Sequence, residues 1–549
     1  MRRKIIYIVA AAVVLGAGCS KKELAVNNPN NPTPASSATE SGILALGLGA
    51  IYQNGFNGIT DTKYTNSFLG SSYWFLAPAY HDLMADVVSA EAANNITNQV
   101  SVPDYVILDD ASKITNTAPA KQVVRIDNSR TKTGSNMFYY EWTWMYFMNN
   151  GCNAVLSALE STSFSGADSV SKRNTVKAWA YFWKGYAYSH IGSIYYAGLI
   201  KDDYLTLSSD YKSSADMITA ANANYDKAIA ALNAVTSTSV YNTIVAALVP
   251  TQCQTGKGGI LTATMWIHNI NTLKARNLLV NKRVKDMTSA DWTNLLTLVS
   301  NGVTSSDLVF TARSAATGGF MSATSGSVSS LTTGNPTSTT YKISERLVQE
   351  YKAGDKRLDS NFIKVPTYLN QKGGFTFSTR YRLLDSGGAA KTYTSRSLTS
   401  KVVGGYELYI GASYEENELM KAEANIKLGN IATGLAGVDA VRTYQNAGLA
   451  AVSGVVTDAT AAYEELRKER RVALLFRNVA LYDARRWGVL DDVSAGGGRT
   501  GCVVVNSTTG VVSTNATINY NFIDYWDVPD DEIALNPPSA TSAAVKNPK

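Results

Sequence analysis

The chain of 549 residues is poor in the side chains on which many enzymes and metal proteins depend. Its three histidines, His81, His190 and His268, form no HExxH pair, and there is no Cys-x-x-Cys motif, so a zinc site has no support. Neither a Gly-x-Ser-x-Gly elbow nor a Walker loop occurs. Adjacent carboxylates such as Asp530 and Asp531 point in different directions and do not predict the opposed pair of a glycosidase. We therefore expect no catalytic residues, no metal and no cofactor.

Two further absences narrow the class of protein. Beyond Cys19 the chain has only Cys152, Cys253 and Cys502, which excludes a disulfide-rich scaffold but allows one bridge plus one free thiol outside the cytoplasm. Neither sign of charge is in strong excess, because 50 basic side chains face 44 acidic ones and give a formal net charge of +6. Nucleic acid is therefore not an expected partner.

One long apolar run is present, and it lies near the N-terminus. It extends from Ile5 to Ala17 after a basic start and leads to Cys19. Its length suits the core of a signal peptide and is short of the ~20 residues that a lasting transmembrane helix needs. The pattern is typical of a bacterial lipoprotein signal, in which residues 1–18 are removed and Cys19 carries the lipid. Gly16 stands where such signals usually have leucine, so an ordinary cleaved signal with a chance cysteine is the alternative; in both cases the mature protein leaves the cytoplasm.

The rest of the chain divides into a tether and one large domain. Residues 19–37 contain an Asn/Pro cluster that cannot form a packed element, and we interpret them as a flexible tether. Residues 38–549 are expected to form a single domain dominated by helical apolar periodicity. This periodicity predicts helices over residues 43–52, 137–159, 172–194, 225–232, 262–281 and 419–426.

Polar stretches interrupt the predicted helices. Inserted loops are expected at about 240–261, 311–340, 386–405 and 491–521. Loops of this length in a compact protein are usually functional or disordered. Within the last of them, a valine-rich run from Cys502 returns after a polar turn, which predicts a β-hairpin.

Tyrosine and tryptophan are abundant, with 31 and 9 residues against 14 phenylalanines. Their rings combine a flat apolar face with a polar group, which suits contacts with sugars or proteins as well as packing between helices. Helical pairs with Ala and Tyr at their contacts are similar to tetratricopeptide units, although the spacing is too irregular for a regular solenoid. We therefore expect a mainly α fold of tetratricopeptide-like pairs with a loop-rich portion and a few short strands.

The C-terminal third carries the most specific pattern. Residues 463–476 read YEELRKERRVALLF and residues 481–488 read LYDARRWG, which together closely resemble the signature of the SusD/RagB family. The segment 528–537, VPDDEIALNP, is similar to the closing segment of that family, and 418–424 is similar to its preceding helix. With the lipoprotein signal and the tether in the same order, the resemblance spans nearly the whole mature chain.

This resemblance implies a SusD-like α-α superhelix and a surface-exposed, lipid-anchored location on the outer membrane of Bacteroidetes. Members of the family bind a nutrient and deliver it to a SusC-like TonB-dependent β-barrel transporter, and they are not enzymes. The leading hypothesis is therefore an oligosaccharide-binding lipoprotein of the cell surface. The alternatives are a peptide-binding member of the same family and a surface hydrolase.

The charged residues of the signature favour a structural role. Glu464 and Lys468 are one helical turn apart and attract each other, whereas Arg467 and Arg471 repel each other at the same spacing. The helix therefore needs carboxylates from elsewhere, which predicts an internal salt-bridge lattice rather than a ligand site. The segment 485–487, Arg-Arg-Trp, can add a cation–π contact.

For ligand contact we single out five residues. Tyr73 and Trp74 follow a Gly-Ser-Ser turn, and the resemblance implies a stacking aromatic residue in this region and another in the mid-chain loop, where Phe320 is the candidate. Asn66 and Arg313 are polar candidates near the same two regions. The alternative for Trp74 is burial in the core.

Overall fold

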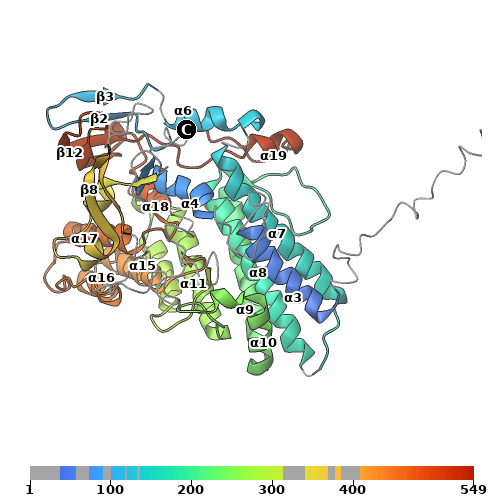
Figure 1. Cartoon of the computed structure of the whole chain (residues 1–549). Coiled ribbons are helices and arrows are strands. Elements are labelled where there is room, and N and C mark those ends of the chain that lie inside the picture. The colour runs from blue at the N-terminus through green and yellow to red at the C-terminus, as the bar shows by residue number, and fades with distance from the viewer. Residues whose placement is uncertain are drawn as a thin grey trace, which may run out of the picture.

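The computed structural model describes most of the predicted domain and is mainly helical. It describes residues 38–56, 73–90, 100–117, 120–132, 136–166, 168–312, 341–368, 378–384, 398 and 408–549. Figure 1 shows the long helices side by side, from α3, α7 and α8 through α9 and α11 to α15, α16 and α17, with strands β2, β3 and β12 together at one corner. The signal, Cys19 and the tether lie outside the described residues.

The helices of the first two thirds are α3 Glu40–Gly49, α4 Tyr73–Met84, α6 Ala120–Asp127, α7 Met137–Ser161, α8 Ser169–Ile194, α9 Ser214–Asn233, α10 Thr238–Leu248, α11 Ala263–Val280, α12 Ser289–Ser300, α13 Glu345–Val348 and α14 Lys356–Asn361. Those of the last third are α15 Tyr414–Lys427, α16 Ile431–Tyr444, α17 Ala459–Ala473, α18 Ala480–Arg486 and α19 Asp530–Leu535. Neighbours along the chain pack in pairs, with α8 on α7 and α9, α12 on α11, and α16 on α15. This pairing agrees with the expected mainly α architecture.

The helices predicted over 137–159, 172–194 and 262–281 are confirmed as α7, α8 and α11. Residues 240–248, expected from the sequence to lie in an inserted loop, belong instead to α10. The helix is short, and its apolar side chains are buried because α10 packs on α3 and α8. Tertiary burial therefore decides the conformation of a segment whose local signal is weak.

Side chains at the helix ends explain where several helices begin and stop. Ser213 and Asp216 form a capping box at the start of α9, and Thr288 and Asp291 form another at the start of α12. In each box the hydroxyl accepts a backbone N–H and the carboxylate accepts in return, which satisfies two donors that the first helical turn leaves free. Gly429, the predicted stop after α15, has φ +88°, a left-handed conformation that glycine adopts at little cost.

Helix α8 organises the core because it is buried along nearly its whole length. Its rings at Trp179, Phe182 and Trp183 pack against Trp266 of α11 and against Phe310. Most of these rings meet edge to face, with centroids 4.8 to 6.1 Å apart. Such pairs add about 0.5–1.5 kcal/mol each beyond the area that they bury. The abundance of tryptophan in this part of the chain is therefore explained by packing.

Gly185 lets α8 approach α9 closely, and Gly185→Ala is expected to lower the free energy of unfolding by about 1–3 kcal/mol, the usual cost of overpacking a core. An added methyl would lie 2.6 Å from the Tyr225 ring and 3.0 Å from the backbone oxygen of Ala221. Chemical denaturation monitored by tryptophan fluorescence measures the change. Gly49→Ala is the matched control, since its methyl would meet only Gln53 Oε1, at 3.4 Å. Equal stability of the two variants would contradict the close-approach argument.

The largest sheet that the described residues form has four strands in the order β11-β12-β2-β3. Its strands are β11 Arg499–Val505, β12 Val512–Asn519, β2 Tyr105–Ile107 and β3 Lys113–Thr115, all antiparallel. The predicted hairpin after Cys502 is confirmed, with Val505 paired to Val512. The sheet joins this hairpin to the N-terminal part of the chain, which the local sequence pattern does not reveal.

Eight short strands form four further antiparallel pairs among the described residues. The pairs are β1 Val88–Ala90 with β7 Tyr341–Ile343, β4 Ala197–Gly198 with β5 Lys212–Ser213, β6 Thr311–Ala312 with β10 Leu408–Tyr409, and β8 Phe362–Tyr368 with β9 Thr379–Leu383. The pairs β4–β5 and β8–β9 join neighbouring segments of the chain, whereas β1–β7 and β6–β10 join segments that several helices or strands separate. They fasten the loop-rich portion to the helices.

The structure also answers the question of cysteine pairing. Cys152, Cys253 and Cys502 all lie within the described residues and are buried, and no disulfide links them to one another. Burial raises the pKa of the Cys152 thiol to about 12, which keeps it protonated and unreactive. In the part of the chain that the structure describes, no helix is both long and apolar enough to cross a membrane.

Candidate functional site

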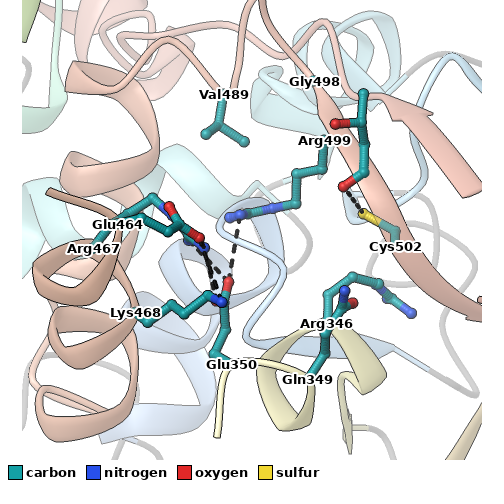
Figure 2. A pocket seen from close by; sticks show the side chains of 11 residues that line it. Arg346, Gln349, Glu350, Glu464, Arg467, Lys468, Val489, Gly498, Arg499 and Cys502 are labelled. Atoms are coloured by element: carbon teal, nitrogen blue, oxygen red, sulfur yellow. Dashed lines mark hydrogen bonds and ion pairs between the residues drawn. The ribbon is translucent and has the colours of Figure 1, made fainter. Parts of the chain in front are cut away.

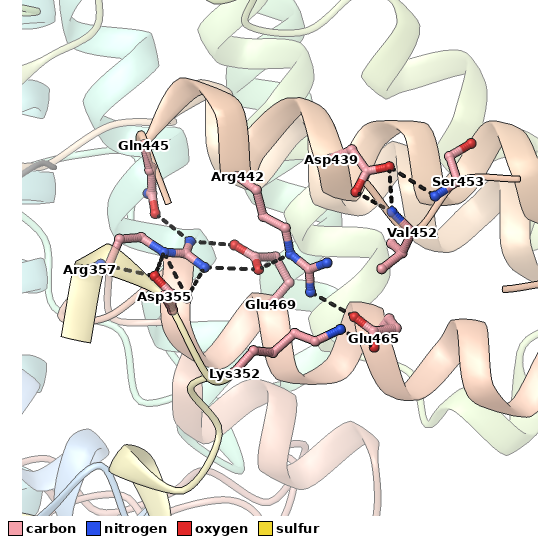
Figure 3. Close-up of polar contacts among 10 residues, drawn as sticks. All are labelled: Lys352, Asp355, Arg357, Asp439, Arg442, Gln445, Val452, Ser453, Glu465 and Glu469. Atoms are coloured by element: carbon pink, nitrogen blue, oxygen red, sulfur yellow. Dashed lines mark hydrogen bonds and ion pairs between the residues drawn. The ribbon is translucent and has the colours of Figure 1, made fainter. Parts of the chain in front are cut away.

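The signature segment forms the internal salt-bridge lattice that its charges predict, and one half of this lattice is centred on Glu469 of α17. Arg357 Nη1 donates to Glu469 Oε1 at 2.5 Å, and Arg442 Nε donates to Glu469 Oε2 at 2.8 Å. Figure 3 shows the Arg357 guanidinium held between Asp355 and Glu469, with the Gln445 amide above it. All of these groups are buried. They therefore tie α14, α16 and α17 together through buried ion pairs.

The other half of the lattice connects α15, α17 and α18. Arg486 donates to Glu423 at 2.6 and 2.8 Å and to Asp483 at 2.7 Å, and Arg470 donates to Asp483 at 2.9 and 3.0 Å. Burial alone would raise the pKa of Asp483, but the two guanidinium groups outweigh it and lower that pKa. Arg486 also lies 4.9 Å from the ring centroid of Trp487, which confirms the expected cation–π contact. The prediction of a structural role for these residues is confirmed.

Two histidines belong to a buried network that the sequence does not suggest. Glu141 of α7 lies 2.6 Å from His81 Nε2 and 2.7 Å from His190 Nδ1. Burial raises the pKa of Glu141, but the charge of His81 and the hydrogen bonds of both rings lower it to about 2. Its contribution to stability is therefore present above about pH 4.5 and is lost as the pH falls toward 2. Within the described residues, no group of His, Cys, Asp and Glu side chains could hold a metal ion.

The ligand-contact residues predicted from the sequence lie mostly outside the described residues. Asn66, Arg313 and Phe320 fall outside them. Tyr73 and Trp74 are the first two residues of α4, so their backbone is helical and does not lie on the preceding turn. Their prediction as ligand contacts is not tested by the structure.

The described chain nevertheless brings the flanks of these predicted regions together. Phe56, which precedes residues 57–72, packs edge to face on Tyr186 at 5.8 Å. Tyr186 in turn lines a small pocket with Pro78 of α4 and Tyr409 of β10. Strand β10 pairs with β6, the strand that ends where the loop of Arg313 begins. The two regions singled out in the sequence therefore start from one face of the domain, around the middle of α8.

A second and more open site lies between α7, the segment after α8, and α19; we call it the α7 cleft. Its volume is about 500 Å³. Figure 1 shows α19 beside one end of α7. The apolar lining consists of Tyr139, Trp142, Tyr146 and Phe147 of α7, Leu199, Tyr204 and Leu207 after α8, and Leu535 of α19. Aromatic side chains at this density in an open pocket are typical of a binding surface.

Hydrogen bonds hold the floor of the α7 cleft in place. Trp142 donates from Nε1 to Glu532 Oε2 at 3.3 Å, and its ring centroid lies 4.6 Å from that of Tyr146. The Tyr146 hydroxyl donates to the carbonyl oxygen of Leu199 at 3.1 Å. Burial raises the pKa of Tyr146 well above its ordinary value, so the hydroxyl stays protonated as a donor. The two rings are therefore set before any ligand arrives.

The rim of the α7 cleft is exposed and carries both apolar and polar groups. Tyr204 is 36% exposed, Leu207 91% and Leu535 75%. Lys201 and Asn150 also line the cleft and can bond hydroxyl groups. Flat rings on the floor and polar groups at the rim together fit a ligand with apolar faces and hydroxyl edges.

The sequence contained a signal for this cleft. Tyr139, Trp142 and Tyr146 follow helical spacing, which places them on one face of α7. The sequence alone does not distinguish this face from the many aromatic residues that pack between helices. Only the tertiary structure, which brings Glu532 of α19 next to Trp142, shows that part of this face of α7 borders an open pocket.

Comparison with known proteins shows the fold. No family model matches the chain, and no curated protein matches it in sequence. Among solved structures, a SusD-like carbohydrate-binding protein from Bacteroides fragilis superimposes with a TM-score of 0.57 at 15% sequence identity, over 90% of this chain and 98% of that one. The chain has the SusD-like fold.

Two further solved structures share the SusD-like fold over most of their length. NanU from B. fragilis has a TM-score of 0.53 at 13% identity and covers 95% of this chain and 100% of its own. A SusD-like carbohydrate-binding protein from Bacteroides vulgatus has a TM-score of 0.51 at 14% identity, with coverage of 92% and 98%. At such low identity the likeness establishes the SusD-like architecture of helices and inserted loops.

Proposed function

We propose that this chain binds an oligosaccharide nutrient at the cell surface and passes it to a TonB-dependent outer-membrane transporter without chemical change. The observation that carries the proposal is the α7 cleft, an open pocket of about 500 Å³ with a preset aromatic floor. The SusD-like fold supports it, since solved structures of this fold include proteins described as carbohydrate-binding.

The chemistry of the α7 cleft favours a saccharide over the alternatives. Rings such as Trp142 and Tyr146 offer flat faces on which a pyranose can stack, and the nearby amide and charged groups can bond its hydroxyls. A peptide would be bound by backbone pairing along a free strand edge, and no strand borders this cleft among the residues described. A hydrolase would need two carboxylates on opposite sides of the substrate, whereas the two that line this cleft, Asp531 and Glu532, are adjacent on the same helix α19.

The location and the partner belong to the same proposal. Lipid on Cys19 would anchor the chain, and residues 19–37 would act as the flexible tether of the domain. A SusC-like TonB-dependent β-barrel is the transporter that the family resemblance implies. Co-purification of a barrel protein with the tagged chain from outer membranes is the expected result, and its absence under gentle detergent conditions would count against this partner.

Truncation of rings in the α7 cleft is expected to weaken glycan binding about tenfold. Tyr139 and Tyr204 are suitable because neither is fully buried, so Tyr139→Ala and Tyr204→Ala should leave the fold intact. A stacked ring is worth about 0.5–1.5 kcal/mol beyond its buried area, and the lost contact area adds to this. Calorimetric titration with the best ligand from a glycan panel measures the effect. Tyr204→Phe, which keeps the ring, is the matched control and should bind within about twofold of the wild type.

Trp74→Ala belongs in the same titration, because it tests the face predicted from the sequence. Loss of binding in Trp74→Ala with unchanged binding in both tyrosine variants would move the ligand site to that face. Binding of peptides but of no glycan would favour the peptide-binding alternative. Turnover of a labelled glycan would overturn the proposal of transport without chemistry.

A further inference from the structure

A separate pocket of about 390 Å³ lies between α13, α17 and β11, away from the α7 cleft; we call it the arginine pocket. Figure 2 shows Arg499 of β11 reaching across it toward Glu350, with Arg467 and Lys468 of α17 on the facing side. Gln349 lies at its edge and is bonded to the backbone of β11. Most of the residues that line the pocket are therefore polar or charged.

Basic groups outnumber acidic ones around the arginine pocket. The basic side chains that line or touch it are Arg346, Arg467, Lys468, Arg471 and Arg499. The carboxylates that face them are Asp86, Glu350 and Glu464. Among the described residues, two positive charges at this place therefore have no carboxylate of their own.

The available carboxylates are already used by other arginines. Arg467 donates to Glu350 at 2.8 and 2.9 Å, and Arg471 Nε lies 3.2 Å from the same carboxylate. Burial and the charge of Arg499 lower the pKa of Arg471 to about 10. Positive charges are crowded at this place, since Arg499 disfavours the charged form of its neighbour Arg471.

Arg499 has one long ion pair and lacks hydrogen-bond acceptors for two of its nitrogen atoms. Its side chain is 10% exposed, and its Nη1 lies 3.9 Å from Glu350 Oε1, too far for a hydrogen bond. Its Nε and Nη2 are buried and have no hydrogen-bond partner among the described residues. A buried charged donor without an acceptor is costly, so natural proteins retain one where something else supplies the acceptor.

We propose that the arginine pocket binds an oxyanion, with Arg499 as its main ligand and Lys468 at the mouth. A carboxylate, sulfate or phosphate group has oxygen atoms spaced for the fork of a guanidinium and would supply the acceptors that Nε and Nη2 lack. The oxyanion has two sources, a free inorganic anion or the acidic group of a saccharide. This site is independent of ligand binding in the α7 cleft.

Calorimetry on the full mature chain distinguishes the two sources. Sodium sulfate and sodium glucuronate are titrated at ionic strength held constant with sodium chloride, and glucose serves as the uncharged comparison. Binding of sulfate alone identifies a free anion, and tighter binding of glucuronate identifies an acidic saccharide. Affinity should fall as sodium chloride is raised. Absence of binding by both anions, or equal binding of glucose, would overturn the proposal.

Variants test whether the arginine pocket is the place of binding. Arg499→Gln is expected to weaken anion binding roughly tenfold to a hundredfold, because it removes charge-assisted hydrogen bonds to the anion. Lys468→Gln, at a side chain 40% exposed, should weaken it severalfold without risk to the fold. Lys274→Gln is the control, because it removes one charge from an ion pair with Asp226, on residues that do not line the pocket.

Thermal melting without anion separates binding from a structural role. Arg499→Gln should melt at or above the wild-type temperature, because it removes a buried charge that repels Arg471. A lower melting temperature together with unchanged anion affinity in Lys468→Gln would show that Arg499 is structural and that the pocket is not the site.

Discussion

Arg486→Met is expected to lower the free energy of unfolding by about 3–5 kcal/mol, because removing one partner of a buried ion pair leaves the other charge uncompensated. Arg486 and Glu423 are both fully buried and joined at 2.6 Å. Without the guanidinium, the Glu423 carboxylate keeps the hydrogen bond that the Tyr463 hydroxyl donates to it at 2.9 Å, which does not neutralise its charge. Asp483 keeps Arg470, so the loss is concentrated on Glu423.

Guanidinium denaturation followed by circular dichroism measures the loss, and Lys421→Met in α15 is the matched control. Lys421 is 41% exposed and lies 3.8 Å from Glu418, so its replacement should change stability by less than about 1 kcal/mol. A variant Arg486→Met with wild-type stability and abolished glycan binding would instead make the signature segment part of the ligand site. Equal losses in the two variants would show that burial of the ion pair is not what matters.

Cys19→Ala is expected to release the protein from the membrane in soluble form. In the proposed lipoprotein the lipid on this cysteine anchors the chain, because the apolar run that precedes it is removed with the leader. The measurements are incorporation of labelled palmitate, fractionation of outer membranes and protease accessibility on intact cells. Cys152→Ala, at a buried thiol inside α7, is the control and should still fractionate with the membrane.

Persistence of the Cys19→Ala variant in the outer membrane, accessible to protease on intact cells, would contradict the lipoprotein interpretation. Soluble release of both variants would mean that the fold, and not the lipid, holds the chain to its partner. The interpretation is supported if palmitate labels the wild type and does not label the Cys19→Ala variant.

The local sequence pattern predicted correctly those helices and strands whose defining residues lie within a few positions of one another. The apolar stripes of α7, α8 and α11 predicted those helices, because side chains three and four residues apart share a face whatever the rest of the chain does. The hairpin from Cys502 was predicted for a similar reason, since its two strands are joined by a short turn. The prediction of a loop over residues 240–248 was wrong, because the helix there depends on burial against α3 and α8.

The sequence by itself determined that the charges of the signature helix need partners, because Arg467 and Arg471 repel each other on one face. Only the tertiary structure decided which carboxylates pair with these arginines and where a guanidinium lacks acceptors. Glu350 lies 117 residues from Arg467 in the chain, and Glu532, which borders the α7 cleft, lies 390 residues from Trp142. Spacing along a helix carries no information about such partners, since it reports only which side chains share a face. The cleft and the arginine pocket exist because distant segments meet, and that meeting is set by burial of the whole core.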